Sequence, residues 1–176
     1  YPNISITNLS NSDDTVSLLK GIEQVDGIVD IHHAGTAMRF LTAYFASKKG
    51  TEVTLTGSKR MQERPIKVLV EALKNMGAEI HYLKNKGYPP LKIIGADLNV
   101  SSVTLNANIS SQYISALMLI ASSLKNGLTI NLEGKITSIP YINMTLNLLK
   151  KVGVLGTLSN NKIQIKPIKT INSITV

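Results

Sequence analysis

The chain of 176 residues has 43% hydrophobic side chains and a formal net charge of +8, which suits one sizeable domain or two small ones. It contains no cysteine, which excludes disulfide scaffolds, cysteine nucleophiles and thiolate zinc sites, and its three histidines are too few for us to expect a metal site. The positive charge favours nucleic acid, an anionic membrane surface or phosphorylated small molecules as partners, while no apolar stretch reaches the roughly 18 residues of a membrane span.

Strand and helix patterns alternate along the sequence. The elements are expected in this order: strand Ile4–Leu9, helix Ser10–Gln24, strand Gly27–His32, helix Ala34–Ser47, strand Glu52–Gly57, helix Arg64–Gly77, strands Ala78–Leu83, Leu91–Gly95 and Ser102–Ala107, helix Ser110–Leu124, strand Leu128–Gly134, helix Ile139–Gly153, and strands Val154–Ser159 and Lys162–Pro167. Pro65 and Pro140 fit the first turns of their helices, and Gly77 stands where a helix-ending glycine is expected.

An internal repeat is visible in the spacing of glycines. Gly50 and Gly57 recur 77 positions later as Gly127 and Gly134, and each pair brackets a strand. After each strand come a loop, a helix begun by proline, a glycine and two further strands. We therefore predict an α/β fold of repeated units, with mixed sheets wrapped around buried helices; chance spacing in an ordinary α/β fold is the alternative.

Three predicted helices begin with small or hydroxyl-bearing residues. Such helix N-termini present free backbone N–H groups to an anion, although each of them could equally be a plain helix cap. The first of these helices is apolar nearly all round, yet it carries Arg39 one turn inside its start, where a cation opposes the helix dipole by about 0.3–1 kcal/mol. The residues singled out at the three starts are Gly35 and Thr36, then Ser110, Ser111 and Gln112, then Ser138 and Tyr141.

A basic loop precedes the helix that contains Pro65. Lys59, Arg60 and Arg64 crowd this loop, and Glu63 compensates only one of them. The cluster is either a clamp for a phosphate or carboxylate, or a solvated basic loop. His33, just before Gly35, could touch a ligand or serve a structural role. No complete acid–base pair is visible, so these residues are suited to binding anions rather than to catalysis.

Four motifs resemble the EPSP synthase (3-phosphoshikimate 1-carboxyvinyltransferase) family: AGTAMR, GSKRMQERPI, SSQYISAL and SIPYINMTLNLLKKVGV. The resemblance covers essentially the whole chain. It implies transfer of the enolpyruvyl group of phosphoenolpyruvate to shikimate 3-phosphate, in the shikimate route to aromatic amino acids, without a metal or organic cofactor. It also implies a protein of two lobes, each built from three βαβαββ-type units, with the active site between the lobes.

The resemblance also implies roles for individual residues. Ser110, Ser111 and Ser138 would hold the phosphate of shikimate 3-phosphate, Tyr141 would lie against its ring, and Gln112 would touch both substrates. Gly35 and Arg60 would take the phosphate of phosphoenolpyruvate, in the region where the family binds glyphosate. Thr36, Arg39 and His33 would support these phosphate-binding residues without direct contact to the substrate. No catalytic residue is expected within residues 1–176.

By the same resemblance, residues 1–176 are one lobe that binds shikimate 3-phosphate, with the other lobe of the same protein as its partner. We expect a monomeric, cytoplasmic enzyme that binds small molecules and neither nucleic acid nor membrane; the lobe alone should bind weakly and not catalyse. His33 stands where the family usually has Asn, and Phe40 stands where it often has Pro.

Two alternatives share some of these features. One is a lobe of the enolpyruvyl transferase that acts on UDP-N-acetylglucosamine, which typically has a cysteine that this chain lacks. The other is a basic RNA-binding or RNA-end-processing module built on related repeats. The segments SSQ and RMQERP favour the shikimate enzyme, because the RNA-binding alternative leaves them unexplained.

Overall fold

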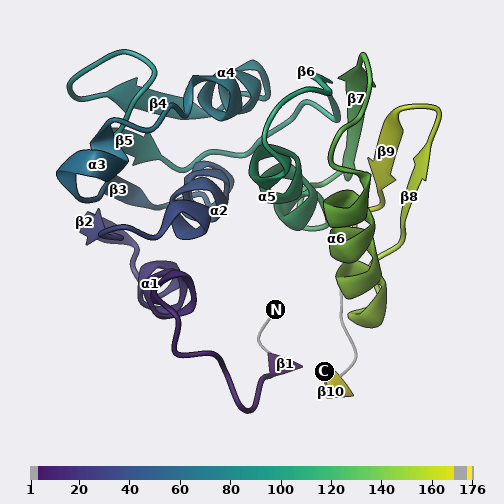
Figure 1. The fold of residues 1–176 in the computed structure, drawn as a ribbon, viewed down its shortest axis with the longest axis horizontal. Coiled ribbons are helices and arrows are strands. Elements are labelled where there is room, and N and C mark those ends of the chain that lie inside the picture. Colours follow the sequence, from purple (N-terminus) through teal and green to yellow (C-terminus); the bar gives the residue numbers. More distant parts are fainter. Residues whose placement is uncertain (1–3, 169–173, 176) are drawn as a thin grey trace. The chain divides into compact units, whose positions relative to one another are not determined.

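The computed structural model describes residues 4–168 and 174–175, and the chain divides into two compact units. The N-terminal unit comprises residues 10–98, and the C-terminal unit comprises residues 1–9 and 99–176 (Figure 1). The helices are α1 (Asp13–Ile22), α2 (Gly35–Ala46), α3 (Lys59–Gln62), α4 (Lys67–Asn75), α5 (Ser111–Ala121) and α6 (Ile139–Lys151). The strands are β1 (Ile4–Ser5), β2 (Asp26–Asp30), β3 (Glu52–Thr56), β4 (Glu79–Tyr82), β5 (Leu91–Ile94), β6 (Ser102–Asn106), β7 (Leu128–Glu133), β8 (Gly156–Ser159), β9 (Lys162–Ile165) and β10 (Ile174–Thr175).

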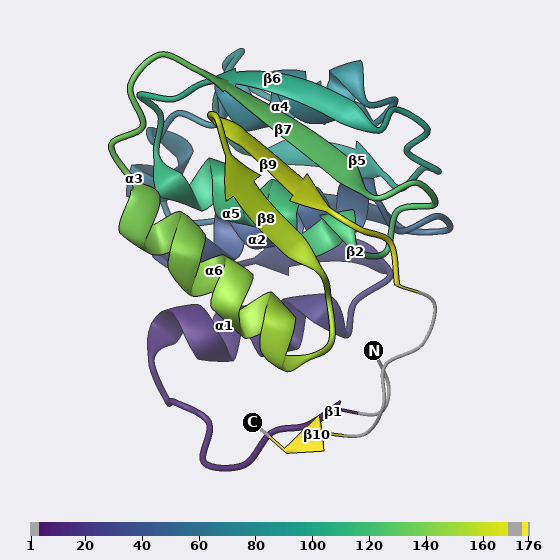
Figure 2. The ribbon, with the colours of Figure 1, turned by 90° about the vertical axis from the view of Figure 1, so that its right-hand side faces the viewer.

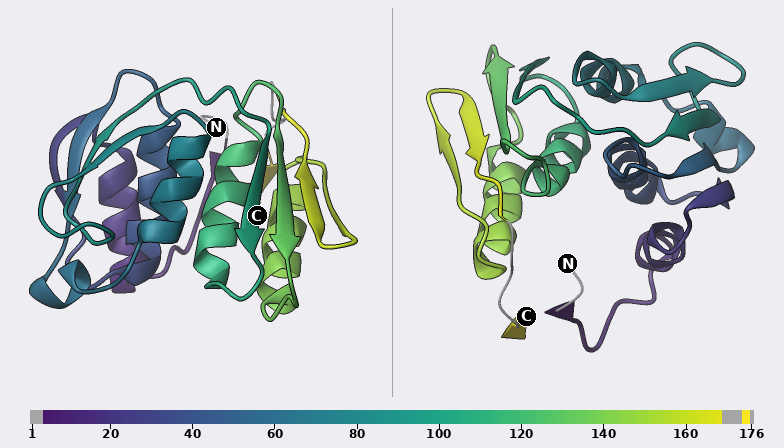
Figure 3. Two further views of the ribbon diagram at one scale, coloured as in Figure 1. Left: turned by 90° about the horizontal axis from the view of Figure 1, so that it is seen from above. Right: turned by 180° about the vertical axis from the view of Figure 1, so that it is seen from behind.

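The N-terminal unit is a four-stranded sheet in the order β2-β3-β5-β4, with α2 and α4 packed on one face. Strands β2 and β3 are parallel, and the remaining neighbours are antiparallel. Figure 3 shows α1, α2 and α4 side by side in this unit. The predicted burial of α2 is confirmed, since its apolar residues Met38, Leu41 and Phe45 are fully buried.

The C-terminal unit repeats this topology. Its sheet has the order β6-β7-β9-β8, with the same sequence of parallel and antiparallel pairings, and α5 and α6 pack against it (Figure 2). The predicted repeat and the mixed α/β fold class are therefore confirmed. Strand β1, which is shorter than the predicted Ile4–Leu9, pairs in parallel with β10 in a separate two-stranded sheet.

The repeat fixes where the helices begin. In each unit the first two strands are parallel neighbours, and their last residues are paired: Asp30 with Thr56, and Asn106 with Glu133. The segments that lead from these strands into the next helices therefore start side by side. The carboxyl ends of parallel strands are a common place for binding sites in α/β sheets, because helix N-termini gather there.

The five predicted helices are present with ends within three residues of the expected positions, and the short helix α3 lies in the segment that was expected to be a basic loop. Gly77 follows α4 with φ of 106°, a conformation that glycine adopts without strain, and Pro140 lies in the first turn of α6 as predicted. Pro65, in contrast, was predicted inside this helix but lies before it: α4 begins at Lys67 after the cap residue Ile66. Ile66 has a φ of −138°, outside the helical range, and its backbone N–H donates to the carbonyl of Gly87 at 2.9 Å.

Across the described ranges 4–168 and 174–175, no helix is both long enough and apolar enough to cross a membrane. The cores are made by aliphatic side chains on the inner faces of the sheets, such as Leu55 and Ile93 in the N-terminal unit and Ile130 and Ile163 in the C-terminal unit.

Candidate functional site

The edge of the N-terminal sheet where β2 and β3 end carries several of the predicted residues. The N–H of Ile31 donates to the carbonyl of Thr56 at 3.1 Å, and the N–H of Ser58 donates to the carbonyl of His32 at 3.0 Å. These two bonds tie the segment that precedes α2 to the segment that precedes α3. Residues that are about 25 positions apart in sequence, such as His33 and Ser58, are thereby held together.

A pocket of about 420 Å³ lies at this edge, and its lining residues are His33, Arg60, Met61 and Arg64. Two guanidinium groups give the pocket a positive lining, and a planar guanidinium is suited to bidentate recognition of a phosphate or carboxylate. The structure thus brings the predicted residues His33 and Arg60 together with Arg64. Lys59, the third cation of the basic loop, is not among the residues that line the pocket.

Gly35, the first residue of α2, lies against the Arg64 guanidinium. A Cβ atom added at Gly35 would collide with Nη1 of Arg64 and would lie 3.1 Å from its Cζ. The missing side chain therefore lets the guanidinium approach the backbone of α2 closely. Through this contact Gly35 lies beside the same pocket as Arg60.

The N-terminus of α2 has a partner that the sequence analysis did not anticipate. Oδ1 of Asp14 accepts hydrogen bonds from the backbone N–H groups of Thr36 at 2.8 Å and Ala37 at 3.2 Å. Asp14 belongs to the first turn of α1, yet its carboxylate caps α2. Two backbone amides that were expected to face an anion, those of Thr36 and Ala37, therefore bind the Asp14 carboxylate of the chain itself. Asp14 does not bind the amide of Gly35.

Arg39 is buried, with 4% of its surface exposed, and lies behind the pocket. Its Nη1 donates to the carbonyl of Gly35 at 3.0 Å and lies 3.7 Å from Sδ of Met61. Its Nη2 donates to the carbonyl of Pro65 at 3.2 Å. This cation, one turn inside α2, therefore binds main-chain carbonyls, and it joins α2 to α3 and to the segment in front of α4.

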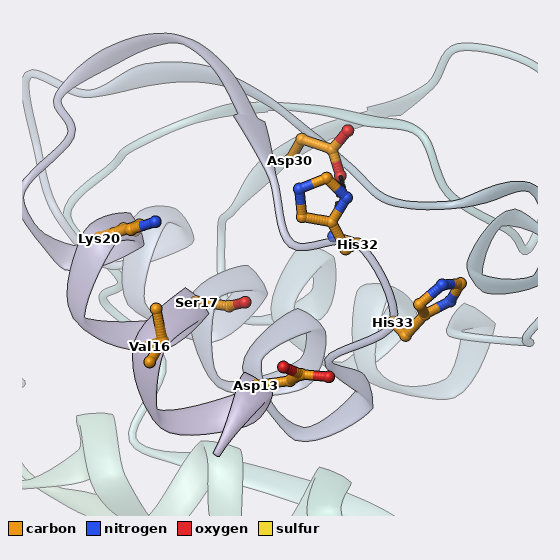
Figure 4. Close-up of a pocket in the computed structure, with 8 residues that line it drawn as sticks. Asp13, Val16, Ser17, Lys20, Asp30, His32 and His33 are labelled. Carbon is orange, nitrogen blue, oxygen red and sulfur yellow. Dashed lines mark hydrogen bonds and ion pairs between the residues drawn. The ribbon is translucent and has the colours of Figure 1, made fainter. Parts of the chain in front are cut away.

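A second pocket, of about 410 Å³, lies between α1 and the segment after β2 (Figure 4). His32 lies against Asp30 there: its backbone N–H donates to Oδ1 of Asp30 at 2.8 Å, and its ring Nδ1 is 3.9 Å from the same oxygen. Figure 4 shows the ring of His33 turned away from both of these residues. The lining comprises Asp13, Val16, Ser17, Lys20, Gly21, Asp30, His32 and His33.

The corresponding edge of the C-terminal sheet carries the other predicted residues. The N–H of Ala107 donates to the carbonyl of Glu133 at 2.7 Å, so the segments that lead to α5 and α6 start together. Ser110 is the cap residue of α5, and its Oγ accepts a hydrogen bond from the N–H of Gln112 at 3.4 Å. Ser138 is the cap residue of α6, three positions before the exposed Tyr141.

Helices α5 and α6 are also joined one turn beyond their starts. Oγ of Ser115 lies 2.9 Å from Oγ1 of Thr145, and this contact is buried. Because both helices follow parallel neighbouring strands, their N-termini point to the same edge of the sheet. The structure thus gathers Ser110, Ser111, Gln112, Ser138 and Tyr141 at that edge.

The hydroxyl of Ser138 has no partner among the described residues. Its Oγ is buried, only 8% of the residue is exposed, and the side chain makes no capping bond to α6. A buried hydroxyl without a partner costs about 1–3 kcal/mol, so it calls for a ligand atom or a water molecule. Among the described residues, the hydroxyl of Tyr82 on the edge strand β4 is also buried without a hydrogen-bond partner. Burial, and to a lesser degree the negative charge of Glu71, raises the pKa of Tyr82 to about 12.

In the described part of the chain, no group of three or more His, Asp or Glu side chains is placed to hold a metal ion. The groups at the two edges include guanidinium, imidazole, hydroxyl and backbone N–H. All of them donate hydrogen bonds, and this arrangement is suited to binding phosphate groups.

A protein-family model described as EPSP synthase (3-phosphoshikimate 1-carboxyvinyltransferase) matches residues 4–176. The chain belongs to the EPSP synthase family. It is 51% identical over 162 residues to the 3-phosphoshikimate 1-carboxyvinyltransferase of Bacteroides fragilis, which covers 92% of this chain and 39% of that protein. It is 48% identical over 122 residues to the enzyme of the same name from Vibrio campbellii, covering 69% of this chain and 28% of that protein.

Solved structures agree on the fold. The EPSP synthase of Acinetobacter baumannii superposes with a TM-score of 0.80 at 17% sequence identity, over 97% of this chain and 43% of that one. Membership of the EPSP synthase family confirms the predicted resemblance and sets aside both the UDP-N-acetylglucosamine and the RNA-binding alternatives. The chain spans about two fifths of the length of its Bacteroides fragilis relative.

Three features of the candidate EPSP synthase site were missed in the sequence. Asp14 stands in the first turn of α1, where an acidic residue favours its own helix, and no local pattern indicates that it caps another helix. Ser58 carried the better signal, because a serine before a short polar segment is a typical helix cap, and its Oγ accepts from the N–H of Met61. The contact between Arg64 and Gly35 depends on tertiary packing and had no sequence signal.

Proposed function

We propose that residues 1–176 form one substrate-binding lobe of an EPSP synthase. The whole protein would transfer the enolpyruvyl group of phosphoenolpyruvate to the 5-hydroxyl of shikimate 3-phosphate. The 5-oxygen forms a bond to C2 of phosphoenolpyruvate, the bond from C2 to the phosphate oxygen breaks, and inorganic phosphate leaves with the hydroxyl proton. The family description and the names of the relatives support this proposal.

In this proposal the C-terminal edge binds shikimate 3-phosphate. Ser110, Ser111 and Ser138 donate hydrogen bonds to its phosphate, Gln112 contacts both substrates, and Tyr141 covers the ring. The single observation that carries the assignment is the buried hydroxyl of Ser138, which has no partner among the described residues and which a phosphate oxygen would satisfy. The N-termini of α5 and α6 add favourable dipoles.

The N-terminal edge then binds the phosphate of phosphoenolpyruvate. Arg60 donates from its guanidinium, and Gly35 contributes its backbone N–H. The pocket lined by Arg60 and Arg64 supports this assignment by its charge. Thr36 and Arg39 hold the backbone around Gly35 through their bonds with Asp14 and with the Gly35 carbonyl, and we assign them no direct contact with substrate.

We expect the chain by itself to bind shikimate 3-phosphate with a dissociation constant on the order of a millimolar, equivalent to about −4 kcal/mol. It should not turn over, because the groups gathered at the two edges bind anions and do not form an acid–base pair. The partner in catalysis is the other lobe of the same protein. We place the complete enzyme in the cytoplasm as a monomer with no organic cofactor.

Two variants test which edge binds which substrate. Arg60→Ala should weaken phosphoenolpyruvate binding by about 10- to 100-fold, since a hydrogen bond to a charged group contributes about 1.5–3 kcal/mol. The same variant should leave shikimate 3-phosphate binding nearly unchanged. Ser138→Ala should weaken the binding of shikimate 3-phosphate and leave phosphoenolpyruvate binding nearly unchanged. Ser159→Ala, at an exposed position of β8, is the matched control. Equal losses of both ligands in either variant would contradict the assignment.

A further inference from the structure

We propose that His33 is an additional anion-binding residue of the pocket lined by Arg60 and Arg64, held in place by Ser58, and that its protonation strengthens the binding of an oxyanion. This inference rests on the proposed function, since it concerns the pocket assigned to the phosphate of phosphoenolpyruvate. It adds a specificity-determining residue to that pocket and a dependence on pH.

The position of His33 is fixed from two directions. Its Nδ1 lies 2.8 Å from Oγ of Ser58, and the N–H of Ser58 donates to the carbonyl of the preceding residue, His32, at 3.0 Å. The segments before α2 and α3 are therefore joined by a main-chain and a side-chain contact. The ring that lines the pocket is anchored, and so less rotamer freedom is lost when a ligand binds.

The hydrogen bonds of Ser58 are compatible with both charge states of the ring. Oγ of Ser58 accepts a hydrogen bond from the N–H of Met61 at 3.3 Å and keeps one proton and a second lone pair. It can donate to Nδ1 of a neutral ring that carries its own proton on Nε2, and it can accept from Nδ1–H of the protonated ring. Nε2–H is the ring donor left for a ligand, both in this neutral form and in the protonated form.

Three neighbouring donors define the class of ligand. Arg60, Arg64 and Nε2–H of His33 can each donate to an oxygen, and none of them can accept from an ordinary ligand hydroxyl. A tetrahedral oxyanion, such as a phosphate group, presents several acceptor oxygens to such a set. Protonation of His33 adds a third positive charge to this lining, so anion binding and proton uptake reinforce each other by linkage.

Charged groups surround His33 on both sides. Arg60 and Arg64 face it from the anion pocket, and Asp13, Lys20, Asp30 and His32 line the other pocket that it borders. The carboxylates of Asp13 and Asp30 favour an added positive charge on the ring, whereas Lys20 and the two guanidinium groups oppose it. A dianion bound in the arginine pocket adds negative charge beside the ring and therefore favours its protonated form.

His32 provides a matched comparison. It is the adjacent histidine, with 80% of its side chain exposed, and its ring lies near Asp30 rather than in the arginine pocket. Figure 4 shows the two rings pointing in different directions. Replacing either histidine removes one titratable group from the same loop and changes the net charge equally, so only a specific role of His33 separates the two variants.

The test uses sulfate as the probe, because it stays a dianion between pH 5.5 and 8 while histidine changes its charge in about this range. Sulfate is titrated into isotope-labelled chain at both pH values, and amide shifts of residues 33–35 and 60–64 are followed. Wild type and His32→Gln should bind sulfate roughly two- to fivefold more tightly at pH 5.5, the size expected for one exposed charge pair. His33→Gln, which keeps an N–H donor but cannot gain a charge, should show the same affinity at both pH values.

Nitrogen shifts of the His33 ring should show the neutral proton on Nε2, and this assignment should be lost in Ser58→Ala. An unchanged pH dependence in His33→Gln, or a wild type without saturable shifts in this pocket, would overturn the proposal. The Arg60→Ala variant separates it from the proposed function. If Arg60→Ala loses sulfate binding while His33→Gln behaves as wild type, only the role of His33 is wrong. If Arg60→Ala still binds sulfate at this pocket, the phosphate assignment itself is wrong.

Discussion

The guanidinium of Arg39 is joined to the carbonyl of Pro65 by a hydrogen bond of 3.2 Å from Nη2, across 26 positions of the sequence. Pro65 directly follows Arg64, so the bond anchors the segment that carries one of the two cations of the anion pocket. The same guanidinium holds the carbonyl of Gly35 at 3.0 Å. One buried side chain therefore fixes both walls of the pocket without lining it.

Replacing this side chain should destabilise the fold. Arg39→Met keeps most of the side-chain volume but leaves the carbonyls of Gly35 and Pro65 without their donor, so we expect a loss of about 2–4 kcal/mol in the free energy of unfolding. Urea unfolding followed by circular dichroism measures it. Arg64→Met is the control, because Arg64 is exposed and should change stability by only about 0.5 kcal/mol. Equal effects of the two substitutions would contradict the role given to Arg39.

Asp14 and Asp13 form a matched pair in the first turn of α1. Asp14→Ala should lower the free energy of unfolding by about 1–2 kcal/mol, because the amides of Thr36 and Ala37 lose their acceptor. Asp13→Ala removes a favourable interaction with the dipole of α1 and should cost about 0.3–1 kcal/mol. Amide hydrogen exchange gives a second check: protection at Thr36 and Ala37 should fall in Asp14→Ala alone. Unchanged exchange at these two amides would rule out the cap.

Gly35→Ala should change ligand binding more than stability. The added Cβ would collide with the far end of the Arg64 side chain, which can move away, so the free energy of unfolding should change by less than about 1 kcal/mol. Phosphoenolpyruvate binding should weaken, because Arg64 leaves its place over α2. A double-mutant cycle with Arg64→Ala tests this explanation. A loss from Gly35→Ala that persists in full without the Arg64 side chain would show that the guanidinium is not involved.

Ser138→Ala should separate stability from binding. The Ser138 hydroxyl is buried without a partner and caps nothing, so its removal should leave the free energy of unfolding unchanged or raise it by up to about 1 kcal/mol. Affinity for shikimate 3-phosphate should fall. Thermal unfolding with and without the ligand measures both effects. A clearly destabilised variant would mean that the hydroxyl serves the fold rather than a ligand.

Much of the fold could be predicted from sequence because the signals were local. The glycine spacing that predicted the repeat reflects turns that recur in both units, where Gly50 and Gly127 have positive φ. Helix α6 has its proline in the first turn and a glycine after its end, as the sequence indicated. Each of these residues acts within a few positions of itself.

The positions that sequence could not supply are set by tertiary contacts. Arg39 opposed the helix dipole in the sequence, and only the structure shows the carbonyls that bind it. An aspartate in the first turn of a helix is common, so the sequence gives no sign that Asp14 binds α2 instead. Helix α4 starts beyond Pro65, where Ile66 has a non-helical φ of −138° and its N–H donates to the carbonyl of Gly87.

Titration of the isotope-labelled chain with shikimate 3-phosphate tests the central claim most directly. We expect saturable amide shifts that cluster at residues 110–112 and 138–141, that weaken as salt screens the charge, and that are much smaller with plain shikimate. Shifts of equal size with plain shikimate, or shifts scattered over the basic surface of the chain, would contradict a shikimate 3-phosphate site at the N-termini of α5 and α6.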